Sequence, residues 1–148
     1  MANIERYGAE LKPALGLVKG AGLKTGAIAA SVAHDSHNLM VIGKSIDDMV
    51  VAINALIESG GGLCVCQDQK VTGLLELPLA GLLSLKTGDE IFHDIKKLKK
   101  AYQNCGITLE EPFIQMAFLA LPVIPKIKLT DRGLFDVTTF SYIALEAK

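Results

Sequence analysis

The sequence lacks an excess of charge of either sign, and it also lacks a long hydrophobic run. Its 148 residues include 15 Lys and Arg against 16 Asp and Glu, which gives a formal net charge of −1. No stretch combines basic residues with interleaved aromatic ones, so electrostatics does not favour a nucleic-acid or anionic-membrane partner. Apolar runs such as residues 116–124 contain Pro122 and are much shorter than the roughly 20 residues that span a bilayer. The sequence therefore predicts neither a nucleic-acid partner nor a membrane partner.

The marks of a secreted protein are missing as well. The first residues, MANIERYG, contain neither the basic region nor the apolar region of a signal peptide. The chain has three cysteines, and this odd number favours free thiols in a reducing compartment over a framework of disulfides. Together these absences predict a cytoplasmic protein.

Apolar residues, by contrast, are plentiful. They make up 50% of the chain, while charged residues make up 21%. This length and composition suit one domain that builds its core without disulfides or metal. In a domain of this size, a high apolar content with almost no net charge favours association. We therefore expect contacts with copies of the same chain, as a homo-oligomer, or with other domains of a longer polypeptide.

Capping and turn signals predict single helices between strand hairpins. Ser45 and Thr87 are each followed, three residues later, by an acidic residue, which is the spacing of a capping box, and Pro112 suits the first turn of a third helix. The predicted helices cover residues 45–58, 87–105 and 112–120, with a short helical stretch at 78–85. The predicted hairpins cover residues 18–33, 63–77 and 126–144, and a separate strand covers 39–42. This order predicts an α+β fold, with helices packed on one or both faces of a largely antiparallel or mixed β-sheet.

One cluster of polar residues interrupts the apolar pattern between two predicted strands: His34, Asp35, Ser36, His37 and Asn38. Imidazole can bind a metal, transfer a proton or donate a hydrogen bond near neutral pH, and Asp35 could orient either ring. A His-x-x-His pair in a turn would still need a third ligand from elsewhere to hold a metal. The alternative is that Asp35, Ser36 and Asn38 satisfy backbone groups in a tight turn while both histidines stay partly exposed.

The other candidates favour structural interpretations. Residues 60–62 are glycines that follow a predicted helix and lack the Lys-Ser/Thr of a phosphate-binding loop, so they indicate a helix C-cap. Cys64 and Cys66 have only Cys105 as a possible third thiol, which is too few for a zinc site, and we expect buried thiols. Glu76 stands among leucines, either exposed from an alternating strand or held in a pocket with a raised pKa, and the exposed position is favoured.

Several stretches carry a resemblance to a known family. In chain order they read GLVKGAGLKTGAIAASVAHDSHNLMVIG, then Asp47-Asp48-Met49 in the following helix, then GGGL and LLELPLAGLLS. They closely resemble the C-terminal domain of bacterial and archaeal adenine deaminases of the amidohydrolase superfamily. The resemblance extends to residues 4–7 near the start and to FLALPVIPKIKLTDRGLFDV near the end, so it covers nearly the whole chain.

The resemblance implies a part in the hydrolysis of adenine to hypoxanthine and ammonia, in purine salvage. Such deaminations use a metal-bound hydroxide, and the family's ligands for a divalent metal, Mn or Fe, belong to a preceding barrel domain. No residue of this sequence matches that ligand pattern, so we expect no metal ligand and no catalytic residue in this chain. Residues 1–148 are therefore interpreted as the C-terminal domain alone, without the barrel and inactive in isolation.

The resemblance also gives the polar cluster a possible place in the assembled enzyme. We expect six residues to lie near the substrate, where those of the cluster would face the mouth of the barrel and close the site or position the purine: His34, Asp35, Ser36, His37, Asn38 and Glu76. The expected partners are the barrel domain of the same enzyme or a copy of this chain, with adenine as a small-molecule ligand. The alternative is a module that stands alone and binds a purine or docks onto another protein without enzymatic activity.

Overall fold

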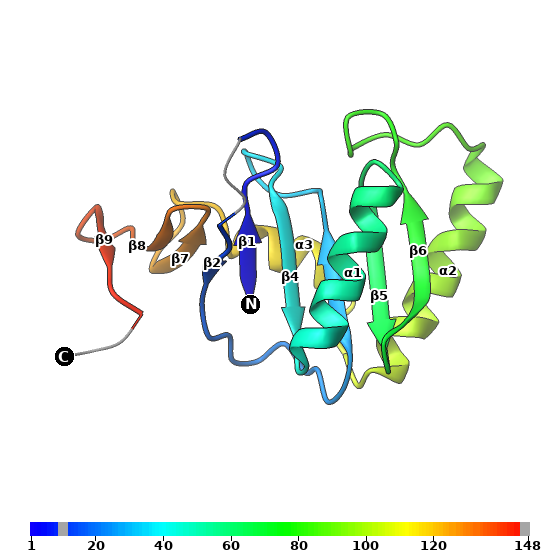
Figure 1. The fold of residues 1–148 in the computed structure, drawn as a ribbon, viewed down its shortest axis with the longest axis horizontal. Helices are drawn as coiled ribbons and strands as arrows, with labels where there is room; N and C mark the ends of the chain where they lie inside the picture. Colours follow the sequence, from blue (N-terminus) through cyan, green and yellow to red (C-terminus); the bar gives the residue numbers. More distant parts are fainter. Residues whose placement is uncertain (9–11, 146–148) are drawn as a thin grey trace.

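A six-stranded antiparallel β-sheet forms the centre of the molecule (Figure 1). The computed structural model describes residues 1–8 and 12–145. The strands of this sheet lie in the order β2-β1-β4-β3-β5-β6. Their bounds are β1 Ala2–Ile4, β2 Ala14–Leu15, β3 Ala27–Ala30, β4 Leu39–Gly43, β5 Gly62–Gln67 and β6 Lys70–Glu76. A second, three-stranded sheet follows, with β7 Ile127–Thr130, β8 Gly133–Asp136 and β9 Ser141–Ile143.

Three helices cover the two faces of the central sheet. Helix α1 (Ile46–Glu58) packs on one face, and α2 (Gly88–Asn104) and α3 (Pro112–Phe118) pack on the other. Because side chains alternate along a strand, β3 contributes Ile28 to the core under α2 and α3, and Ala27 and Ala29 to the core under α1. The sheet therefore has an apolar core on each face, which confirms the predicted α+β class. None of the helices within the described ranges is long and apolar enough to cross a membrane.

The local signals identified most elements correctly. Ser45 caps α1 by accepting a hydrogen bond from the backbone N–H of Asp48, and Thr87 and Glu90 form the capping box at the start of α2. Pro112 occupies the first turn of α3. The hairpin predicted at 63–77 is β5 and β6, and the one predicted at 126–144 is β7 with β8, to which β9 adds a third strand.

Two predicted elements are wrong. Residues 18–26 do not form a hairpin with β3, which pairs instead with β4 and β5. Gly20, Gly22 and Gly26 all have positive φ angles, so the backbone turns where the pattern predicts a strand. Residues 78–85 are not helical either: Ala80 and Gly81 also have positive φ angles and form a tight loop.

The first strands of the two sheets, β1 and β7, are tied together inside the molecule. Asn3 on β1 is buried, and its side-chain Nδ2 donates a hydrogen bond of 2.8 Å to the carbonyl oxygen of Leu129 on β7. Leu129 is itself buried. This bond joins the central sheet to the three-stranded sheet across almost the whole length of the sequence.

Candidate functional site

Four chain segments meet at one end of the central sheet, at the top in Figure 1. Because neighbouring strands are antiparallel, the segments after β1, between β3 and β4, before β5 and after β6 all emerge at this end. We call them the loop edge, which comprises residues 5–8, 31–38, 59–61 and 77–87. The polar cluster that the sequence analysis singled out lies within it.

Arg6 joins two of these segments. Its backbone N–H donates a hydrogen bond of 3.3 Å to the side-chain Oδ1 of the buried Asn38. Its guanidinium donates to the carbonyl oxygen of Ala80 and to the hydroxyl of Tyr7, and its Cζ lies 4.8 Å from the centre of the Tyr7 ring. Arg6 therefore fixes the loop at 31–38 and the loop at 77–87 relative to β1.

Ser31 makes a second link, in the interior. Its side chain is fully buried, and its Oγ donates a hydrogen bond of 2.6 Å to the carbonyl oxygen of Gly81. The same Oγ accepts a bond of 2.8 Å from the backbone N–H of Gly62. A buried backbone group without a partner is costly, so this one hydroxyl stabilises two turns at once.

We expect Ser31→Ala to lower the free energy of unfolding by about 1–3 kcal/mol, because the Gly62 N–H and the Gly81 carbonyl would lose a buried partner. Urea denaturation of the isolated chain measures this change. Ser36→Ala is the matched control, since Ser36 is exposed and its loss should change stability by less than about 0.5 kcal/mol. Equal effects of the two substitutions would contradict the role given to Ser31.

Within the polar cluster, His37 and Asn38 hold the turn. The backbone N–H of Ala33 donates to Nδ1 of His37 at 3.3 Å, and the backbone N–H of His37 donates to the carbonyl oxygen of Ala33 at 2.9 Å. Asn38 is buried and accepts from Arg6. Asn38 therefore satisfies a backbone group, as the tight-turn interpretation expects, whereas His37, which is partly exposed, accepts the backbone bond that this interpretation gave to Asp35 and Ser36.

The other three members of the cluster lie on an open hollow. His34 packs on Phe118 with ring centres 5.1 Å apart, while Asp35 and Ser36 are exposed. The hollow has a volume of about 220 Å³. Its lining residues are His34, Asp35, Ser36, Ala120, Leu121, Pro122, Val123, Thr130 and Asp131. One histidine, one carboxylate and one hydroxyl are thus presented outward on a loop whose base is fixed.

Glu76 is not part of this group. Its carboxylate is exposed, as the sequence favoured, and forms an ion pair of 3.6 Å with Lys86. Lys86 also donates a hydrogen bond of 2.8 Å to Asp94 on α2, and this bond lowers the pKa of the Asp94 carboxyl. Glu76 does not line the hollow beside His34. The structure therefore separates the carboxylate of Glu76 from the exposed part of the polar cluster.

The described residues do not fit a metal ion. Across residues 1–8 and 12–145, no three His, Cys, Asp or Glu side chains gather in a way that could hold one. Cys64 and Cys66 are buried on the α1 side of β5, as predicted. Burial raises the pKa of each of these thiols to about 12, with a hydrogen bond to Asp48 adding to the shift at Cys66. Protonated thiols are poor metal ligands and poor nucleophiles.

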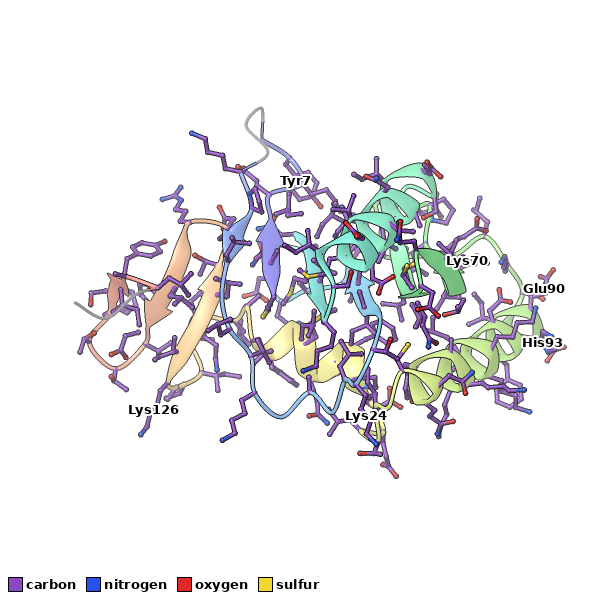
Figure 2. All side chains as sticks on the ribbon, turned by 60° about the horizontal axis from the view of Figure 1, so that its bottom comes forward. Tyr7, Lys24, Lys70, Glu90, His93 and Lys126 are labelled. Atoms are coloured by element: carbon purple, nitrogen blue, oxygen red, sulfur yellow. The ribbon has the colours of Figure 1, made fainter. Side chains whose placement is uncertain are left out.

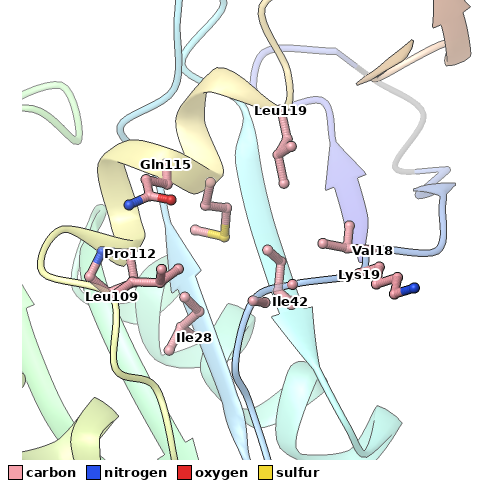
Figure 3. A pocket seen from close by; sticks show the side chains of 11 residues that line it. Val18, Lys19, Ile28, Ile42, Leu109, Pro112, Gln115 and Leu119 are labelled. Atoms are coloured by element: carbon pink, nitrogen blue, oxygen red, sulfur yellow. The ribbon is translucent and has the colours of Figure 1, made fainter. Parts of the chain in front are cut away.

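The pocket in Figure 3 lies elsewhere, between α3 and the central sheet, and it suits packing better than recognition of a ring. Its volume is about 120 Å³, whereas ligand pockets usually measure about 300–1,000 Å³. Its lining is mostly apolar, with Ile28, Ile42 and Met116 among the side chains, and it contains no histidine and no carboxylate. It therefore offers none of the residues that the sequence analysis selected.

The sequence pattern alone indicates no role for Arg6 and none for Ser31. Both lie in stretches that carry the family resemblance, which was the only signal available for them. Their partners are distant in sequence, since Arg6 contacts Ala80 and Ser31 contacts Gly81. No local sequence pattern predicts contacts between residues so far apart in the chain.

Comparisons with known proteins agree on one family. A family model described as "Adenine deaminase C-terminal domain" matches residues 1–141. A protein named adenine deaminase from Bdellovibrio bacteriovorus is 64% identical over 148 residues, which is 100% of this chain and 25% of that protein. Adenine deaminases from Shigella sonnei and Escherichia coli are 53% and 52% identical over 146 residues, again 25% of their length. The chain thus spans about a quarter of the curated relatives that it matches.

Proposed function

Because this chain belongs to the adenine deaminase C-terminal domain family, we propose that it is the C-terminal part of an enzyme that hydrolyses adenine to hypoxanthine and ammonia in purine salvage. In this proposal the chain closes or shapes the active site and performs no chemistry itself. The divalent metal, Mn or Fe, is held by a preceding barrel domain and supplies the activated water. The enzyme works in the cytoplasm, where the free thiols of this chain stay reduced.

The observation that carries this proposal is the arrangement of the loop edge. Hydrogen bonds from Arg6 and Ser31 hold its segments together, and His37 and Asn38 fix the base of the loop at 31–38. The polar side chains of Asp35 and Ser36 then project outward from this base, with His34 beside them on the hollow. A polar tip on a rigid base suits contact with a substrate or a neighbouring domain, because little entropy is lost when such a group is engaged.

The test is steady-state kinetics on a full-length adenine deaminase whose C-terminal quarter is replaced by this chain. Alanine substitutions of His34 and of Asp35 should each lower kcat/KM for adenine by about tenfold, the equivalent of one lost polar contact. We expect most of this change in KM, since these groups position the purine or close the site. Metal content and thermal stability should stay the same.

The matched control is His93→Ala. His93 is exposed on α2, lies well away from Tyr7 in Figure 2 and does not line the hollow beside His34, so kcat/KM should not change. Unchanged kinetics in the His34 and Asp35 variants would contradict the proposed role. Turnover of adenine by the purified isolated chain would contradict the absence of chemistry, and binding of adenine without turnover, measured by calorimetry, would favour a purine-binding module.

A further inference from the structure

Helix α1 is apolar along one flank as well as on its inner side. Ala52, Ile53 and Leu56 are buried against the sheet, as expected for a helix that covers one face. Ile46, Val50 and Ile57 lie on the flank beside this buried side, with 78%, 52% and 56% of their surfaces exposed. Residues three, four or seven positions apart share a face of a helix, so these three side chains form one exposed stripe.

The stripe continues into a groove beside the edge of the sheet. Side chains of α1, β1, β2 and β4, together with Pro13, form the groove, whose volume is about 400 Å³. Its lining residues are Ala2, Ile4, Pro13, Leu15, Val41, Ile46, Met49, Val50, Ile53 and Asn54. The amide of Asn54 is the only polar side chain among them. An exposed apolar stripe that continues into an apolar groove is typical of an interaction surface, so this flank of α1 calls for a second partner.

The other long helix shows the contrast. Four lysines, at 96, 97, 99 and 100, keep the outer side of α2 solvated. Helix α1 carries no basic residue between Ile46 and Glu58, and its exposed acidic residues, Asp47 and Glu58, lie beside the apolar stripe and not in it. The two helices cover opposite faces of the same sheet. On α2, charged side chains stand among the few exposed apolar ones, whereas the exposed stripe of α1 contains no charged side chain.

Family membership and the position of β1 indicate which partner would occupy the groove. The relatives are about four times as long as this chain, which matches their C-terminal part, so the rest of their chain joins at the position aligned with Met1. Met1 immediately precedes β1, its amino nitrogen lies 2.9 Å from the carbonyl oxygen of Gly16, and the next residue, Ala2, lines the groove. A preceding domain would therefore be tethered beside the groove, at a high effective concentration.

We propose that the groove between α1 and the β1–β2 edge is the docking surface for the preceding, catalytic part of the adenine deaminase chain. The contact is intramolecular, Ile46, Val50 and Leu15 are its centre, and Ile57 extends it along the exposed stripe of α1. This inference rests on family membership and on the groove, and it does not depend on any role of His34 or Asp35. The two proposals can therefore fail separately.

The experiment places a photo-crosslinking amino acid at Val50 in the full-length chimera that carries this chain as its C-terminal quarter. Irradiation followed by mass spectrometry should identify crosslinks between position 50 and peptides from the preceding three quarters of the same chain. The same amino acid at Lys97, exposed on α2, is the matched control and should give none. Crosslinks from position 50 to residues 1–148 of a second copy would overturn the proposal in favour of a homo-oligomer interface, and no crosslink at all would overturn it in favour of an open surface.

A charged side chain introduced into the groove tests the docking by a second, independent measurement. We expect Val50→Asp to lower the melting temperature of the full-length protein by about 2–4 °C while leaving that of the isolated chain unchanged, because only the full-length protein buries this position. Ile114→Asp is the control, since Ile114 is 50% exposed on α3, on the opposite face of the sheet from α1, and should change the melting temperatures of the full-length protein and of the isolated chain equally. Equal shifts in the full-length protein and the isolated chain would mean that Val50 acts only within this domain and would contradict docking.

Discussion

Gly61→Ala is expected to lower the free energy of unfolding by about 2–4 kcal/mol, which is a large share of the stability of a domain this size. The φ angle of Gly61 is +120°, where any side chain is strained. A Cβ there would also collide with the Cα of Gly81 and would lie 2.8 Å from Oγ of Ser31. The new Cβ would collide with a backbone atom, so no change of side-chain rotamer relieves the clash.

Gly133→Ala separates the two causes of this loss. Gly133 has nearly the same φ angle, +125°, but nothing lies within 4 Å of a Cβ built on it. Its substitution should cost only the backbone strain, about 1 kcal/mol. Urea denaturation of both variants and the wild type gives the difference, and equal losses at the two positions would show that the close approach to Gly81 does not matter.

The second large effect is a loss of stability in alkali that comes from the two buried thiols of β5. Burial raises the pKa of Cys64 and of Cys66 to about 12 in the folded chain, from an ordinary value of 9.0. Below pH 9 both thiols are protonated in the folded and the unfolded chain, so their contribution to stability is fully present. Between pH 9 and 12 only the unfolded chain ionises them, so stability falls as the pH rises, by on the order of 1 kcal/mol per pH unit for each thiol.

Denaturant titrations at several pH values between 8 and 12, in the presence of a reducing agent, test this effect. Lysines and tyrosines also titrate in this range, so the informative quantity is a difference in slope. A variant with both Cys64→Ala and Cys66→Ala should show a shallower decline than the wild type. Parallel declines would mean that these thiols are no harder to ionise in the folded chain than in the unfolded one.

The elements that the sequence predicted well are those whose signals are local. The caps at Ser45 and Thr87 and the β5–β6 hairpin depend on residues a few positions apart, so the sequence pattern contains them. Residues 78–85 have the apolar character of a short helix, but distant contacts from Arg6 and Ser31 hold Ala80 and Gly81 in a loop instead. Non-local contacts overrode a local preference there.

The candidate site shows the same limit. The sequence identified the polar cluster as a set, but it could not separate His37 and Asn38, which hold the turn, from Asp35 and Ser36, which face solvent. That distinction depends on the Oδ1 of Asn38 meeting the backbone of Arg6, 32 positions earlier. Glu76 was placed correctly at the surface, although only the structure shows that Lys86 engages its carboxylate and that it stands apart from the hollow.

The buried bond from Asn3 to Leu129 has a consequence for the order of folding. The bond joins β1 to β7 through two residues that are 126 positions apart in the sequence. Strand β1 also pairs with β2 and β4. Closing so long a loop is entropically expensive and tends to come late. Within this domain β1 is synthesised long before β7, so β1 can pair with β2 and β4 while Asn3 still lacks its partner. Until almost the whole domain has emerged, nothing ties the central sheet to the three-stranded sheet at this point, and the junction between the two sheets is the part of the domain most open to mispairing.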